Sequence, residues 1–217
     1  MSRKTAAPTL FGDPEDDDTL FFERSLWNHG HRYVAGCDEV GRGPLAGPVV
    51  AAAVVLPPGI ELPGVTDSKK LSEERRRELL PSILGAADAV AIGFCDQAEI
   101  DQINILQASR AAMTRALGGL LVPATHVLVD GNQKIPIATP QTTIIKGDVR
   151  SLSVAAASIV AKVVRDELMR AMHARWPEYG FDRNRGYPSA EHRDALRRHG
   201  PCPIHRRSYQ PVAEVLA

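Results

Sequence analysis

The stretch that decides the fold is Tyr33-Val34-Ala35-Gly36-Cys37-Asp38, which predicts a mostly apolar strand that closes on an acidic residue. A loop from Glu39 to Gly47 follows, and Pro48 to Leu56 then predicts a second strand, rich in valine and alanine. Because the connection between these strands is short, we expect them to pair antiparallel. The predicted sheet therefore opens with two paired strands whose connecting loop begins beside acidic side chains.

Outward from this pair, helix and strand patterns alternate along the chain. Thr19 is expected to cap a short helix through Trp27, and Ser72 a charged helix that is bent or ended at Pro81. Further helices are expected at 98–117, 152–174 and 190–198, and further strands at 89–95, 126–130 and 142–145. The alternation indicates an α/β fold, a mixed sheet flanked by helices with a helical C-terminal extension.

Length and composition fit one globular domain. The chain has 217 residues and a mass of 23.5 kDa, with 44% hydrophobic and 24% charged residues, so it can bury a core without disulfides. No clean linker divides residues 19–217, which we expect to form a single domain. Residues 1–18 predict a flexible acidic tail before it.

The sequence favours a cytoplasmic protein without a membrane span. The longest unbroken apolar run, Val49 to Leu56, is far shorter than a bilayer crossing, and no signal-peptide core follows the N-terminus. The cysteines are scattered and odd in number, which argues for a reducing compartment: Cys37, Cys95 and Cys202. The pairs Cys202-x-x-His205 and His29-x-His31 lack a second pair at ligand spacing, so we expect no zinc site.

Charge is distributed unevenly although the formal net charge is zero. Residues 1–30 carry three basic side chains against six acidic ones, whereas residues 183–209 carry seven arginines against Glu191 and Asp194. An arginine-rich segment of this kind can bind phosphate backbones through forked contacts, or it can simply be a solvated helix face. Composition alone leaves these two interpretations open.

Four acidic residues occupy positions that solvated surface charges would not. Asp38 and Glu39 close the first strand, and Asp130 follows the apolar run His126-Val127-Leu128-Val129 directly. Asp166 borders the apolar stripe of the helix expected at 152–174, whose polar side we assign to three other residues: Ser158, Lys162 and Arg165. Any one of these acids could instead be a cap, a turn residue or a salt-bridge partner.

Acidic side chains that converge need a counter-charge. Two carboxylates about 4 Å apart repel by roughly 4 kcal/mol at an effective dielectric near 20, so such pairs are tolerated where divalent cations neutralise them. Oxygen ligands with few histidines favour Mg²⁺ or Mn²⁺ over zinc. Since neighbouring strand residues point to opposite faces, Asp38 and Glu39 can share a site only if the strand ends or twists there.

The loop Gly41-Arg42-Gly43-Pro44-Leu45-Ala46 resembles a dinucleotide-binding pattern, but the pattern requires a helix to follow and a strand follows here. A nicotinamide oxidoreductase is therefore excluded. The loop instead offers exposed backbone amides and one arginine beside two acids, which suits the close approach of a sugar-phosphate backbone.

With these residues in place, the sequence resembles the bacterial type 2 ribonucleases H. The matching blocks occur in family order over nearly all of residues 33–211: Asp38-Glu39-Val40-Gly41-Arg42-Gly43, Asp67-Ser68-Lys69-Lys70-Leu71, Val129-Asp130-Gly131, Lys146-Gly147-Asp148, the run from Ala156 to Asp166, Asn184-Arg185-Gly186-Tyr187-Pro188 with Glu191-His192, and Ile204-His205-Arg206-Arg207-Ser208-Tyr209. Arg42 between the glycines is typical of type 2 rather than type 3. Tyr209 stands where many relatives have phenylalanine.

The resemblance implies a ribonuclease H-like fold and roles for particular residues. It implies four metal-binding catalytic carboxylates: Asp38, Glu39, Asp130 and Asp166. It implies that the ribose 2′-hydroxyl is read by Gly41, Arg42 and Gly43, and that Tyr187 stacks on the adjoining deoxyribose. Phosphate contacts are expected from four further residues: Ser68, Lys69, Lys146 and Arg150. Arg150 is the least secure of these, because its neighbour Asp148 is an equally good structural partner.

The implied activity is hydrolysis of the RNA strand of RNA–DNA hybrids, and incision at single ribonucleotides in duplex DNA. Our hypothesis is two-metal-ion catalysis with Mn²⁺ or Mg²⁺ that leaves 3′-hydroxyl and 5′-phosphate ends. The alternatives are a related metal-dependent DNA nuclease and a non-catalytic hybrid-binding protein. We expect a monomer without membrane association, and the sequence does not indicate a protein partner.

Overall fold

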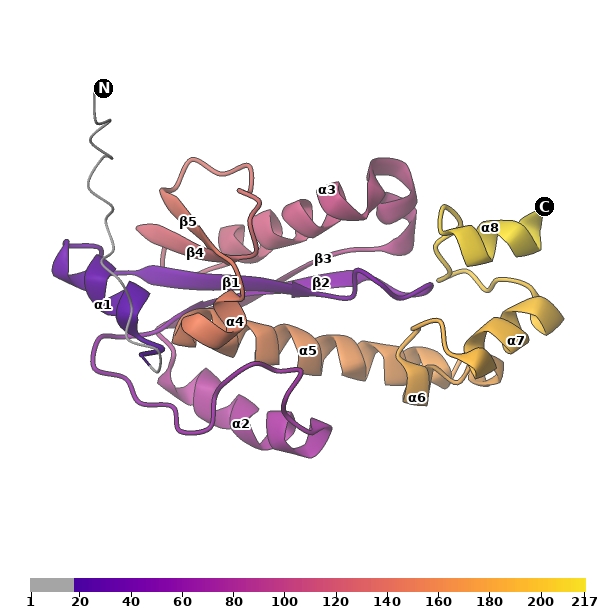
Figure 1. The fold of residues 1–217 in the computed structure, drawn as a ribbon, viewed down its shortest axis with the longest axis horizontal. Helices are drawn as coiled ribbons and strands as arrows, with labels where there is room; N and C mark the ends of the chain where they lie inside the picture. Colours follow the sequence, from indigo (N-terminus) through magenta and orange to yellow (C-terminus); the bar gives the residue numbers. More distant parts are fainter. Residues whose placement is uncertain (1–17) are drawn as a thin grey trace, which may run out of the picture.

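The computed structural model describes residues 18–217 and contains one mixed, five-stranded sheet in the order β3-β2-β1-β4-β5 (Figure 1). The strands are β1 (Val34–Val40), β2 (Val49–Val55), β3 (Ala89–Cys95), β4 (His126–Asp130) and β5 (Gln141–Ile144). The expected antiparallel pairing of β1 with β2 is confirmed, and β2 pairs antiparallel with β3. By contrast, β4 pairs parallel with both β1 and β5.

Helices cover both faces of this sheet, as the alternating pattern predicted. One face carries α3 (Gln97–Gly118), and the other carries α2 (Glu73–Ala86) and α5 (Leu152–His173) (Figure 1). The helix α1 (Phe21–Asn28) lies at one end of the molecule. At the other end lies the helical C-terminal extension: α6 (Phe181–Asn184), α7 (Ala190–His199) and α8 (Gln210–Leu216).

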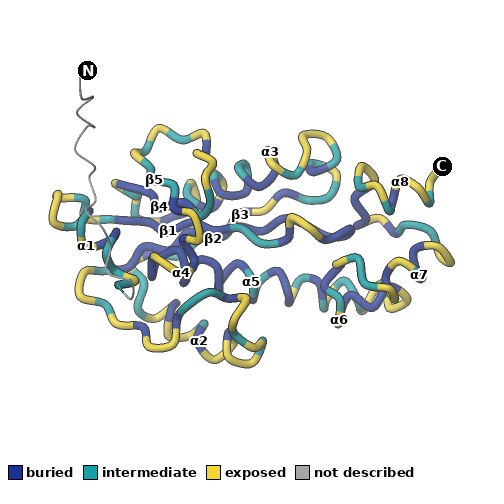
Figure 2. The backbone as a smooth tube through the Cα atoms, viewed as in Figure 1, coloured by how far each residue is buried: buried dark blue, intermediate teal, exposed yellow. Residues whose placement is uncertain are grey.

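The helix α5 is the central element, because it is buried on nearly every side (Figure 2). It crosses β1 so closely that a Cβ atom on Gly36 would collide with the backbone of Ser153 and Val154. The expectation of a polar side on this helix is wrong at two of three positions, since Ser158 and Arg165 are both buried. Their polar atoms bond to neighbouring segments instead of water, which periodicity alone does not reveal.

Several element boundaries differ from the sequence-based expectations. Thr19 does not cap α1; Asp18 instead accepts the backbone N–H of Leu20 at 3.1 Å. Ser72 does cap α2, but the helix continues past Pro81 to Ala86. The helix α3 is interrupted at Asn104, whose φ of 66° leaves the helical region.

Short helical turns were not predicted, because they carry too few residues for a periodic pattern. They are α4 (Gly147–Arg150), the 3-10 turn η1 (Pro177–Tyr179), α6 and α8. The acidic tail expected over residues 1–18 lies, apart from Asp18, outside the described residues. Within residues 18–217, every helix is too short or too polar to span a bilayer.

Candidate active site

The parallel pairing of β1 with β4 brings three acidic residues to one place. Cys37 is level with Val129 across the two strands, so the next step places Asp38 beside Asp130. The strand β1 does not end at this point but continues through Glu39 to Val40. The carboxylates therefore meet at the carboxyl end of a parallel strand pair, where ligand chemistry gathers in open sheets.

Burial and mutual repulsion both act on this cluster. Burial raises the pKa of Asp38 well above its usual range, and the negative charges of Glu39 and Asp130 raise it further. Burial also raises the pKa of Glu39; the Arg42 guanidinium, 3.4 Å from its Oε1, opposes this shift, and Asp130 adds to it. These acids thus share a poorly solvated space, and the cations near them, Arg42 and Lys69, are both largely exposed to solvent.

Asp148 is a fourth acid at this place, and the sequence analysis did not count it among the metal ligands. It lies in the first turn of α4, directly after Gly147, whose N–H donates to Asp130 Oδ1 at 2.7 Å. Burial raises the pKa of Asp148, the Lys69 ammonium at 3.3 Å opposes the shift, and the charge of Asp130 adds to it. The signal that could have found it is the acid in Lys146-Gly147-Asp148, which the sequence analysis considered only as a structural partner for Arg150; in the structure it pairs with Lys69 instead.

Asp166 is buried on α5 as predicted, but its neighbours are cationic. Its Oδ1 accepts a hydrogen bond from Lys162 Nζ at 2.6 Å and lies 3.8 Å from Arg185 Nε. Its Oδ2 lies 3.7 Å from the Arg76 guanidinium. Asp166 thus forms the centre of a buried ion network, and its predicted role as a metal ligand stays a prediction.

The donor chemistry of the first cluster fits a hard divalent cation. Carboxylate oxygens without thiolates or imidazoles are ligands for Mg²⁺ or Mn²⁺, and a divalent charge would relieve the repulsion that raises the pKa of Asp38. Among residues 18–217, no three acidic, histidine or cysteine side chains lie close enough together, as oriented, to hold a metal ion. Asp130, whose Oδ1 is turned to Gly147, would have to reorient to join one.

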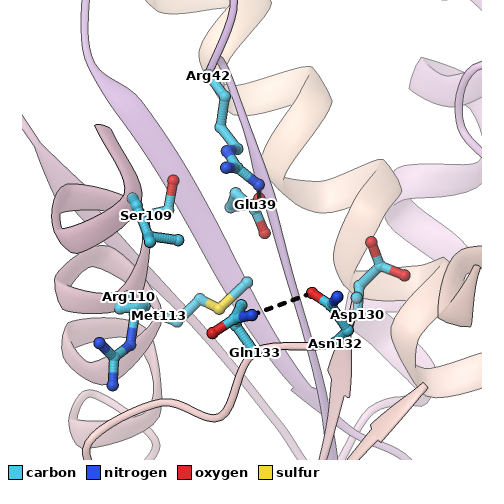
Figure 3. Close-up of a pocket in the computed structure, with 10 residues that line it drawn as sticks. Glu39, Arg42, Ser109, Arg110, Met113, Asp130, Asn132 and Gln133 are labelled. Carbon is cyan, nitrogen blue, oxygen red and sulfur yellow. Dashed lines mark hydrogen bonds and ion pairs between the residues drawn. The ribbon is translucent and has the colours of Figure 1, made fainter. Parts of the chain in front are cut away.

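A hollow lies next to these acids, and Arg42 of the glycine loop (Gly41 to Gly47) is part of its lining (Figure 3). The other lining residues come from β1, from the end of β4 with the segment after it, and from α3: Glu39, Asp130, Gly131, Asn132, Gln133, Leu106, Ser109, Arg110 and Met113. In Figure 3, the side chains of Arg42 and Glu39 point into the space between α3 and Asp130. The α3 residues had no chemical signature in the sequence, so their place in the lining was not foreseen.

Tyr187, predicted to stack on the substrate, lies beside the same loop. A Cβ atom added to Gly43 would be 3.5 Å from its ring, and the side chain is 42% exposed. Gly41 has a φ of 98°, which favours glycine, and a Cβ there would collide with the buried Arg165 side chain. The structure thus brings Gly43 and Tyr187 together, while Gly41 packs against Arg165.

The predicted phosphate contacts divide into exposed and buried groups. Lys69 and Lys146 are exposed, and Lys146 has the left-handed φ of 57° just before α4. Ser68 is buried, with its Oγ 2.6 Å from Ser158 Oγ. Arg150 is exposed, and its guanidinium carbon lies 5.2 Å from the centroid of the Phe22 ring.

The C-terminal arginines also divide into two groups, which neither interpretation of the composition anticipated. Five are exposed: Arg183, Arg193, Arg197, Arg198 and Arg207. Arg185 and Arg206 are buried, and Arg206 donates hydrogen bonds to backbone carbonyls of the glycine loop. Part of the positive charge is therefore structural.

Comparisons with known proteins point to one family. A family model described as Ribonuclease HII matches residues 35–212. The "Ribonuclease HII" of Syntrophotalea carbinolica is 54% identical over 202 residues, which cover 93% of this chain and 97% of the relative. The "Ribonuclease HII" of Geobacter metallireducens is 52% identical over 208 residues, covering 96% and 98% respectively.

Solved structures confirm the expected ribonuclease H-like fold. The ribonuclease H2 of Pyrococcus horikoshii OT3 superposes with a TM-score of 0.72 at 28% identity, covering 84% of this chain and 96% of that one. Bst-RNase HIII in complex with Mn²⁺ has a TM-score of 0.65 at 21% identity, covering 85% and 69%. The chain therefore belongs to the ribonuclease HII family, hydrolases that act on RNA in RNA–DNA hybrids.

Proposed function

We propose that this chain hydrolyses the RNA strand of RNA–DNA hybrids and also incises duplex DNA at single embedded ribonucleotides, by two-metal-ion catalysis that leaves 3′-hydroxyl and 5′-phosphate ends. The observation that carries the proposal is the juxtaposition of Asp38 and Asp130 beside the glycine loop. The carboxylates there lack sufficient internal counter-charge, and the adjoining loop can approach a sugar-phosphate backbone closely.

In this proposal Asp38, Glu39 and Asp130 hold Mn²⁺ or Mg²⁺. The fourth carboxylate is Asp148 rather than Asp166, because Asp148 shares the electrostatic field of Asp130 whereas Asp166 is already neutralised by cationic side chains. A bound divalent ion supplies a nucleophilic water at neutral pH and stabilises charge on the leaving oxygen. Lys69, held by Asp148, is placed to contact a phosphate and keep the scissile strand close to the acids.

Selection for RNA requires a group that senses the 2′-hydroxyl, which is the feature that separates RNA from DNA at one site. We assign this task to the backbone and side chain of Gly41, Arg42 and Gly43. Tyr187 is exposed enough to stack on the adjoining deoxyribose, and its ring lies next to Gly43. Recognition of this kind is independent of base identity.

All three cysteines are buried and free of disulfides, which is compatible with a cytoplasmic location. A monomer remains our expectation for the oligomeric state. Lys146 and the exposed C-terminal arginines are proposed to contact the duplex backbone on either side of the cleaved bond. Arg150 lies over the Phe22 ring and would have to leave it to contact a phosphate.

The test is cleavage of a labelled DNA duplex that contains one ribonucleotide, beside an all-DNA duplex and a long RNA–DNA hybrid. We expect a nick at the ribonucleotide that requires Mn²⁺ or Mg²⁺, with no cleavage of the all-DNA duplex. Equal cleavage of the all-DNA duplex would favour a DNA nuclease. Tight binding without metal-dependent turnover would favour a hybrid-binding protein.

A further inference from the structure

The glycine loop is held from behind by a buried arginine of the C-terminal extension. Arg206 is completely buried, and its guanidinium donates to the carbonyls of Gly41 at 2.6 Å, Arg42 at 3.0 Å and Gly47 at 3.0 Å. Tyr209, which lies beside Arg206, donates its hydroxyl to the Arg42 carbonyl at 2.6 Å. One side chain from near the C-terminus thus fixes three peptide groups of a loop near residue 45.

These contacts set the direction of particular N–H groups. In a trans peptide the carbonyl and the following N–H point to opposite sides of the chain. Because Arg206 draws the carbonyls of Gly41 and Arg42 toward itself, it turns the N–H groups of Arg42 and Gly43 away from itself. A Cβ atom on Gly43 would be 3.5 Å from the Tyr187 ring, so the N–H groups left free in this way lie next to Tyr187.

The residue before Arg206 reaches Tyr187 by a separate route. His205 Nε2 lies 3.0 Å from His192 Nε2, and His192 Nδ1 lies 2.9 Å from the Tyr187 carbonyl. A carbonyl only accepts, so His192 Nδ1 carries the proton, and His205 Nε2 must therefore donate to His192 Nε2. The Cys202 N–H completes the chain by donating to His205 Nδ1 at 3.0 Å.

Burial maintains the neutral state that this chain requires. It lowers the pKa of His205 to about 4, and the neighbouring His192 adds to the shift. The pKa of His192 is lowered as well, also by burial. Each ring then has one N–H and one acceptor nitrogen, and the direction of every hydrogen bond from Cys202 to Tyr187 is determined.

We propose that His205 and Arg206 are positioning residues for ribonucleotide recognition: Arg206 orients the N–H groups of the glycine loop, and His205, through His192, holds Tyr187 at a fixed distance from them. The two recognition elements are far apart in the sequence, and this dipeptide joins them. The inference rests on the proposed function, because it assigns these residues to the reading of the 2′-hydroxyl.

The test measures binding rather than cleavage. With Ca²⁺ in place of Mn²⁺, the dissociation constant is measured for a duplex with one ribonucleotide and for the matching all-DNA duplex. The discrimination ratio is the dissociation constant of the all-DNA duplex divided by that of the ribonucleotide duplex. We expect Arg206→Gln to lower this ratio about tenfold, because it weakens the binding of the ribonucleotide duplex and leaves that of the all-DNA duplex unchanged. A tenfold change corresponds to about 1.4 kcal/mol of binding free energy. We expect Arg206→Lys, with a single nitrogen, to be intermediate, and His205→Asn to reduce the ratio about threefold.

Two matched variants serve as controls. Arg115→Gln removes another arginine that donates to a backbone carbonyl, that of Phe94, and His126→Asn removes another buried histidine, at the opposite end of β4 from Asp130. Both should keep the wild-type ratio. Thermal unfolding identifies the folded variants, and a merely structural role of Arg206 would weaken both duplexes equally.

The outcomes separate this inference from the proposed function. A wild-type ratio of one would overturn the proposed function and this inference with it. A wild-type preference for the ribonucleotide that survives unchanged in folded Arg206→Gln would overturn the inference alone. If Arg206→Gln does not fold, unchanged ratios in Arg206→Lys and His205→Asn would overturn it instead.

Discussion

Two buried sites in the molecule contain carboxylates, and their charge is compensated in opposite ways. Asp166 on α5 has three cationic partners from the protein itself, namely Lys162, Arg76 and Arg185. Asp38, by contrast, is surrounded by the negative charges of Glu39 and Asp130, and its pKa is raised well above the usual range. Both carboxylates are nearly inaccessible to water, so burial alone does not distinguish them.

The comparison separates charge that the fold itself pairs from charge that it leaves unpaired. A buried carboxylate is costly unless it is paired, and the Asp166 network supplies its own pairing in the folded chain. The Asp38 cluster leaves most of that compensation to be supplied from outside, which is the condition under which a divalent cation binds. A third buried acid, Glu23, is compensated by uncharged donors instead: its Oε1 accepts hydrogen bonds from Ser151 and Ser153.

The largest expected effect comes from Asp38→Asn. Metal stabilisation of the transition state is worth several kcal/mol, so losing it should lower kcat on a hybrid about 1,000-fold. The unfolding temperature should stay the same or rise, because the substitution removes a repelled, desolvated charge. Single-turnover cleavage and thermal unfolding measure the two quantities. An active variant, or one that unfolds well below the wild type, would contradict the assignment.

Asp166→Asn should show the opposite behaviour. It leaves Lys162, Arg76 and Arg185 without their shared carboxylate, and breaking a buried ion pair typically costs about 3–5 kcal/mol. We expect that loss in the free energy of unfolding in urea. Asp148→Asn is the matched comparison: it should cost less stability and weaken metal binding more. If Asp166→Asn weakens metal binding more than Asp148→Asn, the fourth carboxylate is Asp166.

Metal binding should stabilise the folded protein through the Asp38 cluster and not through the Asp166 network. A cation that binds only the folded state at 100 times its dissociation constant adds about 2.7 kcal/mol. Thermal unfolding with increasing Mn²⁺ should therefore shift upward in the wild-type protein, and not in Asp38→Asn. Asp166→Asn should start lower but respond to Mn²⁺ as the wild type does. An equal shift in all three proteins would indicate metal binding elsewhere.

The smallest expected effect concerns His126, whose titration contributes to the pH dependence of stability and must be known before the Asp38 cluster and the Asp166 network are compared at different pH. Burial lowers the pKa of His126 from 6.5 to about 4, with a contribution from His31. The folded state then binds fewer protons than the unfolded one, so the stability contributed by neutral His126 is present above pH 6.5 and is lost as the pH falls toward 4. His126→Asn should flatten the decline of the unfolding temperature in this range. An unchanged slope would show that His126 does not contribute.

The sequence identified much of the fold because its main elements carry strong local patterns. The apolar run from Val49 to Val55 forms β2, and the period of Ala156, Ile159 and Val163 forms the core face of α5. The carboxylates Asp38 and Asp130 were found in the same way, since each follows an apolar strand. A pattern of this kind reports how a segment is buried, whatever it is buried against.

Tertiary structure alone decided what each polar group meets. Asp148 and Asp166 each end a matched block of the sequence. In the structure, however, Asp148 lies near Asp130, whereas Asp166 lies against cations from α2 and the C-terminal extension. Arg206 and Arg207 are neighbours of the same type, but one is buried behind the glycine loop and the other is exposed. The physical reason is that hydrophobic burial follows local periodicity, whereas the partner of a charge is set by distant segments that only the completed fold brings together.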